Sequence, residues 1–372
     1  MAKACPLMRS VRLAGAYAAC AIGSGFATGQ EIMQFFTSHG IMGMAGIVLT
    51  TVIFSWCGAS FMKHGFDFSL RSPEEVQNFY FGKRLGKIAA FAMPIFLYLF
   101  YIVMISGAGA ALSEYFGISS YPGRILMSLL TLITVLLGLS GLTELLGRLG
   151  IVIIFFTLLI GILGFVRDPG GIADVPGLLF STGIPKASES WLLSALLYPG
   201  FNAIFVMVLS CCLGADADDR QEAVIGGALG GILFGLAIFV MNLGLLANLG
   251  AVGNKAVPTV ALAKLISPFL SAGFSLIVLC GIYTTAVPML WSVVRYFAED
   301  QTKESAVTAV LLSAVGLVPG LPDFGRLVSV IYPLSGYIGT GILILTALRD
   351  LQLYKKKQYP YEKSSQQNNL WG

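Results

Sequence analysis

Long apolar runs separated by short polar segments cover most of the chain. A stretch of about 20 mostly apolar residues is long enough for an α-helix to cross a lipid bilayer. The pattern predicts ten membrane-spanning helices, at residues 11–36, 41–62, 88–112, 125–139, 145–166, 191–213, 223–249, 272–297, 306–318 and 327–348. We therefore expect an all-α integral membrane protein whose residues 1–372 form a single transmembrane domain.

The first and sixth apolar runs each contain helix-breaking residues near their middle. The first contains Gly23-Ser24-Gly25, and the sixth contains Pro199-Gly200, where proline removes a backbone donor and glycine relaxes the chain. Unwound backbone in lipid is tolerated only where it lines a cavity or holds a ligand. Breaks in the first helix of each half predict two inverted five-helix repeats, residues 9–167 and 190–350, with a solute site between them. The alternative is that the glycines only allow helices to cross closely.

Composition places most of the molecular surface in lipid. Hydrophobic residues make up 56% of the chain and charged residues only 11%, compared with about 25% in soluble domains. The basic residues are scattered between apolar runs, which argues against a nucleic-acid partner. Most Lys and Arg residues fall on one side of the predicted topology if both termini are cytoplasmic, with 351–372 as a polar cytoplasmic tail.

The first run also carries a family resemblance. The motifs are Gly15-Ala16-Tyr17, Gly23-Ser24-Gly25-Phe26-Ala27 and Gly29-Gln30-Glu31-Ile32. They resemble the opening of the YkvI-type bacterial membrane proteins, which are placed in the amino acid–polyamine–organocation (APC) superfamily. More distantly, the Gly-Ser-Gly segment is similar to the broken first helix of sodium-coupled transporters with the leucine-transporter (LeuT) fold. The resemblance implies a secondary transporter in the bacterial cytoplasmic (inner) membrane that moves a small amino acid, or a related amine or carboxylate, by alternating access.

The resemblance also implies a solute site between the two predicted breaks. In this fold the first break holds an anionic group of the solute, and the sixth helix faces it. The residues that would surround the solute are Gly23, Ser24, Gly25, Tyr198, Gly200, Phe201 and Asn202. The third helix lines the central site in this fold, so Tyr98 and Tyr101 are further candidates. The alternative for both tyrosines is packing, with each hydroxyl bonded to a neighbouring carbonyl.

A sodium site is implied beside the first break. Carbonyl groups of Ala19 and Ile22 would face the Gly281 carbonyl and the hydroxyls of Thr284 and Thr285. The fifth run has no Lys between residues 151 and 166, which favours Na⁺ as the coupling ion over a proton-carrying lysine. The alternative is that both threonines bond back to their own helix.

Five charged residues are candidates for gates. Glu31, about six residues beyond the first break, is costly near the membrane. It is expected to bind a cationic solute, carry a proton, pair with Arg326 as an external gate, or simply face water. At the inner side, Arg9 or Arg12 is a candidate partner for Glu299, and the alternative is that these arginines are solvated charges at the cytoplasmic surface.

The sequence does not favour an enzyme. It lacks a metal-binding His or Cys cluster, a phosphate-binding Gly loop followed by Lys-Ser/Thr, and a nucleophile elbow with a plausible His. Two alternatives to a sodium-coupled carrier stay open. One is a membrane sensor or accessory protein that binds solute without moving it, and the other is a proton-coupled carrier. The sequence leaves the oligomeric state and the identity of the solute open.

Overall fold

The computed structural model describes residues 6–138, 142–299, 302–315, 317–318 and 322–356, and its regular structure there is helical. The elements are α1 (Pro6–Ala21), α2 (Ser24–Thr28), α3 (Gln30–Phe35), η1 (Thr37–His39), α4 (Ile41–Phe68), α5 (Pro73–Phe116), α6 (Tyr121–Leu137), α7 (Leu142–Arg167), η2 (Pro169–Asp174), α8 (Val175–Thr182), α9 (Trp191–Ala215), α10 (Arg220–Ala247), α11 (Leu249–Val252), α12 (Pro258–Ile266), α13 (Pro268–Phe297), α14 (Lys303–Val315) and α15 (Phe324–Lys356). The predicted all-α membrane architecture is therefore confirmed.

Six of these helices are long and apolar enough to cross a membrane. They are α4, the Phe91–Phe116 part of α5, α9, α10, α13 and α15. A seventh candidate is the pair Val152–Arg167 and Pro169–Ser181, which is bent by 83°. The first, fourth and ninth predicted runs appear as shorter helices, so the count of ten spans in two repeats stays a prediction. Helix α15 continues to Lys356, so the first residues of the predicted polar tail are helical; residues 357–372 lie outside the described residues.

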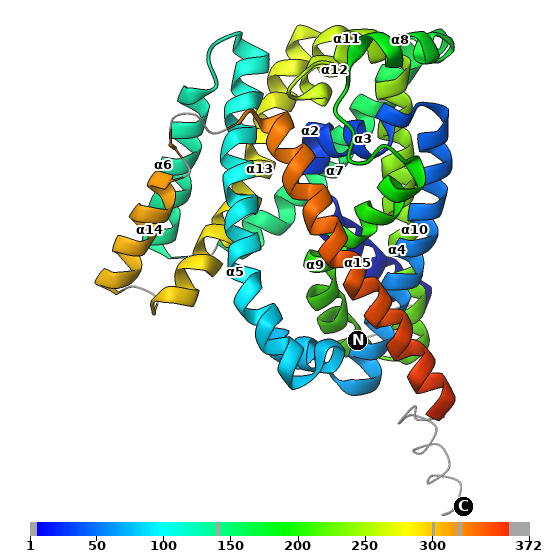
Figure 1. Ribbon diagram of the computed structural model, residues 1–372, viewed down its shortest axis with the longest axis vertical. Helices are drawn as coiled ribbons and strands as arrows, with labels where there is room; N and C mark the ends of the chain where they lie inside the picture. The colour runs from blue at the N-terminus through cyan, green and yellow to red at the C-terminus, as the bar shows by residue number, and fades with distance from the viewer. Residues whose placement is uncertain (1–5, 139–141, 300–301, 316, 319–321, 357–372) are drawn as a thin grey trace, which may run out of the picture.

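Most of the long helices sort into two groups (Figure 1), whereas α7 packs on α10 and also touches α13. In the first group α1, α4, α9 and α10 pack against one another, and in the second α13 packs on α5, with α6 and α14 beside them. α15 runs along α9 and also touches α5, so it lies between the groups. Helices α4 and α10 cross at Gly58 and Gly227, where a Cβ atom on Gly227 would lie 2.1 Å from the Gly58 carbonyl oxygen. The first group is therefore held together by close backbone contact.

The predicted break in the sixth run is wrong, because α9 continues as a helix through residues 198–202. Pro199 cannot donate to the carbonyl of Ala195, but the Thr50 hydroxyl of α4 donates to that oxygen at 2.8 Å. A neighbouring hydroxyl therefore replaces the missing backbone bond. Gly200 serves the crossing with α15, since a Cβ atom there would lie 2.6 Å from the Gly336 carbonyl oxygen.

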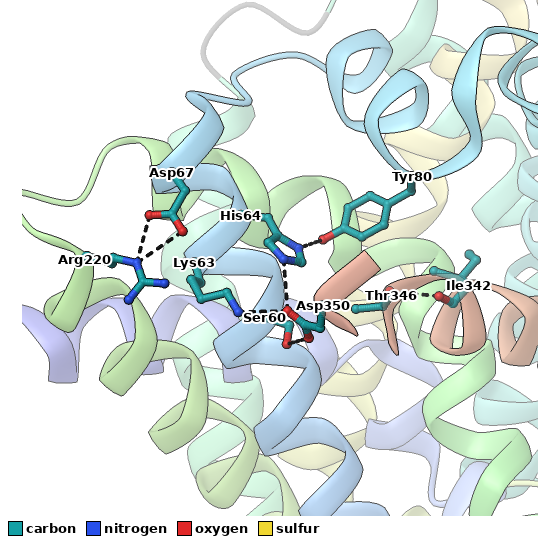
Figure 2. A network of polar contacts seen from close by, with 9 residues as sticks. All are labelled: Ser60, Lys63, His64, Asp67, Tyr80, Arg220, Ile342, Thr346 and Asp350. Atoms are coloured by element: carbon teal, nitrogen blue, oxygen red, sulfur yellow. Dashed lines mark hydrogen bonds and ion pairs between the residues drawn. The ribbon is translucent and has the colours of Figure 1, made fainter. Parts of the chain in front are cut away.

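A partly buried polar network ties α15 to α4 near the C-terminal end of both helices (Figure 2). The carboxylate of Asp350 accepts hydrogen bonds from Ser60 Oγ at 2.6 Å and from Lys63 Nζ at 2.8 Å. His64 Nε2 lies 3.0 Å from Asp350 Oδ1, and its Nδ1 lies 2.7 Å from the Tyr80 hydroxyl on α5. Helix α15 is thus joined at one end of the molecule to α4 and α5, which are far from it in sequence.

The predicted inner gate between Arg9 and Glu299 is wrong. Arg9 pairs instead with Asp218, in the turn between α9 and α10, while Glu299 is exposed beyond the end of α13. At the same end, Asp67 of α4 accepts a hydrogen bond at 2.9 Å from Arg220 of α10. The charged groups at this end therefore connect members of the first helix group to one another.

Candidate solute-binding site

The first apolar run leaves helical geometry between α1 and α2. Gly23 is extended, with φ −86° and ψ −176°, and α2 begins at Ser24. In an unbroken helix the Gly23 amide would donate to the carbonyl of Ala19, but here it donates to Ala21 at 3.0 Å. The glycines that predict a break thus lie where the chain leaves the helix, and polar backbone groups there are released from helical bonding.

A cavity of about 420 Å³ opens at this break. Its walls come from both helix groups and from α15. The lining residues are Ala19, Cys20, Ala21, Ile22, Gly23, Ser24, Gly25, Glu31, Leu97, Phe100, Met104, Ile153, Phe201, Asn202, Phe205, Gly281, Thr284, Thr285, Pro288, Met289, Ser292 and Tyr332. The structure therefore brings five of the predicted solute residues and all five predicted sodium ligands to one cavity.

Glu31 lies in the wall of this cavity, and its predicted external pairing with Arg326 is wrong. Gly29 adopts a left-handed conformation between α2 and α3, with φ 79°, so the run bends instead of continuing straight. Glu31 is only 4% exposed, and its Oε2 accepts a hydrogen bond from the Tyr198 hydroxyl at 3.0 Å. Arg326 is exposed.

Gly25 makes the room that this carboxylate occupies. A Cβ atom on Gly25 would lie 1.8 Å from Glu31 Oε1 and 2.9 Å from the Tyr332 hydroxyl oxygen. Both polar atoms therefore lie directly over the backbone of α2. Any side chain at position 25 has to displace the carboxylate or the tyrosine.

Four aromatic residues form another part of the wall, named here the aromatic wall: Phe100, Phe201, Phe205 and Tyr332. Phe201 stacks on Tyr332 with ring centroids 4.6 Å apart and on Phe100 at 5.5 Å. The ring of Phe205 meets Phe100 edge-on at 4.9 Å. The sequence prediction included only Phe201, because the other three lie in apolar runs where an aromatic residue carries no distinguishing signal.

Four predicted solute residues are not in the cavity wall. Tyr98 donates to the Leu312 carbonyl of α14 at 2.8 Å, and the Tyr101 hydroxyl lies 3.2 Å from Thr131 of α6. Both tyrosines therefore connect α5 to other helices of the second group. Tyr198 lies outside the cavity wall and donates a hydrogen bond to Glu31. Gly200 faces α15 at the crossing of the two helices.

The predicted sodium ligands differ in their ability to hold a hard cation. Thr284 and Thr285 each donate to the Gly281 carbonyl, at 2.8 and 2.9 Å. Their hydroxyl lone pairs stay free to face a cation, but the carbonyl that accepts both protons is engaged. The hydroxyls and the Ala19 carbonyl thus fit the role, whereas Gly281 does not.

Comparison with known proteins supports the resemblance. The chain is 27% identical over 345 residues to "Uncharacterized membrane protein YkvI" of Bacillus subtilis, covering 89% of this chain and 93% of that protein. It is 26% identical over 340 residues to "Uncharacterized protein YyaD" of the same organism, covering 88% and 93%. No protein-family model matches. The predicted similarity to YkvI-type membrane proteins is confirmed.

Solved structures of transporters share the fold. A mutant manganese transporter of Eremococcus coleocola superposes with a TM-score of 0.61 at 16% identity, covering 94% of this chain and 79% of that one. MhsT in complex with L-phenylalanine superposes with a TM-score of 0.56 at 15% identity, covering 90% and 87%. This chain therefore has the LeuT-type fold of membrane transporters.

Proposed function

We propose that the protein is a secondary transporter that moves a small solute across the membrane by alternating access. The observation that carries this proposal is the cavity at the Ile22–Gly23 break, which lies between the two helix groups. Opened backbone within an apolar run is stable when it faces a ligand or water, and such breaks are where transporters of this architecture bind their cargo. Relative movement of the two helix groups would open the cavity to each side in turn.

The helix contacts support two bodies that move separately. The first group is held by close glycine crossings and by the Asp67–Arg220 pair. Members of the second are joined by the hydroxyl contacts of Tyr98 and Tyr101. Strong contacts within each group, with a cavity between the groups, suit rocking of one body against the other.

Sodium is the proposed coupling ion. Ala19, Ile22, Thr284 and Thr285 would bind it in the cavity wall, where it would bridge the two helix groups. The variant with Val at both threonines should lose sodium-dependent thermal stabilisation, because it keeps the shape of the site without the hydroxyls. If the midpoint of thermal unfolding of the Thr284→Val/Thr285→Val variant were still higher in NaCl than in KCl, this assignment would be contradicted.

Cys20 offers a test of alternating access that needs no known solute. This thiol lines the cavity, and the other cysteines can be replaced to leave it alone. A membrane-impermeant maleimide should label Cys20 both from right-side-out and from inside-out vesicles, with the ratio of the two rates changing when NaCl replaces KCl. Labelling from one side only, under every condition, would favour a sensor over a carrier.

A further inference from the structure

We infer that the cargo is an organic cation, a primary amine with an apolar body, whose ammonium group binds the carboxylate of Glu31. This inference rests on the transporter proposal and adds the chemical class of the solute. It depends on three features of the cavity: a single buried carboxylate, the absence of a basic residue from its described lining, and the aromatic wall.

The charge of the site is the first step. Among the described residues that line the cavity, Glu31 is the only Asp, Glu, Lys or Arg. Its carboxylate is 4% exposed, and the partner that the structure gives it is the neutral hydroxyl of Tyr198. A buried carboxylate without a positive partner is costly, so a cation that enters the cavity gains the interaction that the protein does not supply.

The positioning of the carboxylate is the second step. Tyr198 holds Oε2 from behind, and the absence of a side chain at Gly25 leaves room for Oε1. The carboxylate is therefore fixed by its surroundings and lies at the cavity. An ammonium group donates up to three hydrogen bonds and would form a charge-assisted pair with Oε1.

The aromatic wall is the third step. The aromatic wall lines the same cavity as Glu31, and its four rings pack against one another in stacked and edge-on contacts. Such a surface accepts an apolar or aromatic body, and ring faces also attract cations. A cavity of about 420 Å³ has room for an arylalkylamine.

The lining also disfavours a solute that carries a carboxylate. In the absence of the proposed Na⁺, an amino acid would bring a second negative charge into a cavity whose described lining contains no Lys or Arg. Like charges in a poorly solvated site repel strongly. A zwitterion is therefore expected to bind less tightly than the amine that lacks its carboxylate.

Three probes of one shape test this inference: phenethylamine, 2-phenylethanol and phenylalanine. They share the phenylethyl body and differ in charge as cation, neutral alcohol and zwitterion. Binding to the full-length protein in nanodiscs is measured by equilibrium dialysis in potassium phosphate, with empty nanodiscs as the blank. We expect phenethylamine to bind at least 10-fold more tightly than either of the other two.

Substitution of the carboxylate is the second arm. Glu31→Gln should weaken phenethylamine binding at least 10-fold, and Glu31→Asp should retain most of it. Glu189→Gln is the matched control, because it removes a carboxylate whose side chain is 95% exposed. This variant should bind phenethylamine as tightly as the unaltered protein does. If Glu31→Gln does not fold, the three probes on the unaltered protein still decide.

Four results would overturn the inference. The first two are no measurable phenethylamine binding and phenylalanine binding as tight as phenethylamine binding. The other two concern Glu31→Gln: an unchanged affinity for phenethylamine, or a loss of sodium-dependent stabilisation and of nothing else. The Cys20 labelling test separates this inference from the transporter proposal. Labelling from both sides together with a preference for phenylalanine would leave the transporter standing and remove the amine. Tight phenethylamine binding together with Cys20 labelling from one side only would leave the amine assignment standing and remove the transporter proposal.

Discussion

The first apolar run and helix α9 contain similar helix-breaking residues, yet only the first is interrupted. Between α1 and α2, Gly23 is extended and its amide bonds to the nearby Ala21 carbonyl. In α9, Pro199 lies within a continuous helix because the Thr50 hydroxyl satisfies the Ala195 carbonyl. Breaking residues therefore open a helix only where the neighbouring helices do not replace the lost hydrogen bonds.

The two regions also use glycine differently. At Gly25 the missing side chain leaves space for a functional carboxylate, whereas at Gly200 it allows the backbones of α9 and α15 to approach. The first use is chemical and the second is structural. Substitutions in the two regions should accordingly change different properties, binding in the first and stability in the second.

The largest effect on binding is expected at Gly25. Gly25→Ala should lower phenethylamine affinity at least 10-fold, because its Cβ atom would lie 1.8 Å from Glu31 Oε1 and would displace the carboxylate. The thermal midpoint should change little, since the displaced atoms are the ends of side chains. Gly15→Ala, whose Cβ atom would meet no side chain or neighbouring helix within 4 Å, is the control and should bind phenethylamine normally. Normal binding by Gly25→Ala would show that the carboxylate is not held in this place.

The largest effect on stability is expected at the crossing of α9 and α15. A Cβ atom on Gly339 would lie 1.8 Å from the Gly200 carbonyl oxygen, and backbone cannot move aside as a side chain can. Gly339→Ala should destabilise the protein by roughly 1–3 kcal/mol, seen as a lower midpoint of thermal unfolding. Gly341→Ala, on the same helix with open space around its Cβ position, should unfold as the unaltered protein does. Equal midpoints for the two variants would contradict the close crossing.

A smaller effect is expected from the hydroxyl that supports Pro199. Thr50→Val leaves the Ala195 carbonyl without its donor and should cost about 1 kcal/mol. Pro199→Ala restores a backbone amide that can bond to that carbonyl. The loss caused by Thr50→Val should therefore be smaller in the Pro199→Ala background, which thermal unfolding of all four proteins will measure. An equal loss in both backgrounds would mean that the hydroxyl does not compensate for the proline.

Local chemistry explains which parts of the site the sequence predicts. Consecutive small residues at 23–25 disfavour a helix wherever they occur, so the break follows from the segment itself. The Thr284–Thr285 pair occupies one helix turn, and its place beside the break is what the family resemblance implies. Predictions that depend on a few adjacent residues could therefore be made from the sequence.

Distant residues explain what the sequence does not predict. The continuity of α9 depends on Thr50, which is 145 positions away from the carbonyl it satisfies. The placement of Glu31 depends on the turn at Gly29, where a Cβ atom would lie 2.7 Å from Thr259. The network around Asp350 joins residues that are 287 positions apart. No periodicity or motif reports such pairings, because they exist only once the helices have packed.

Backbone amide exchange tests most directly the claim that the first run opens at a cavity while α9 stays closed. In nanodiscs, peptides covering residues 22–26 and 198–206 are compared by hydrogen–deuterium exchange and mass spectrometry. The account predicts fast exchange in the first peptide, slowed by phenethylamine, and slow exchange in the second with or without it. Equally slow exchange in both peptides would contradict it, because the first run would then be an intact helix without an opened backbone to hold a solute.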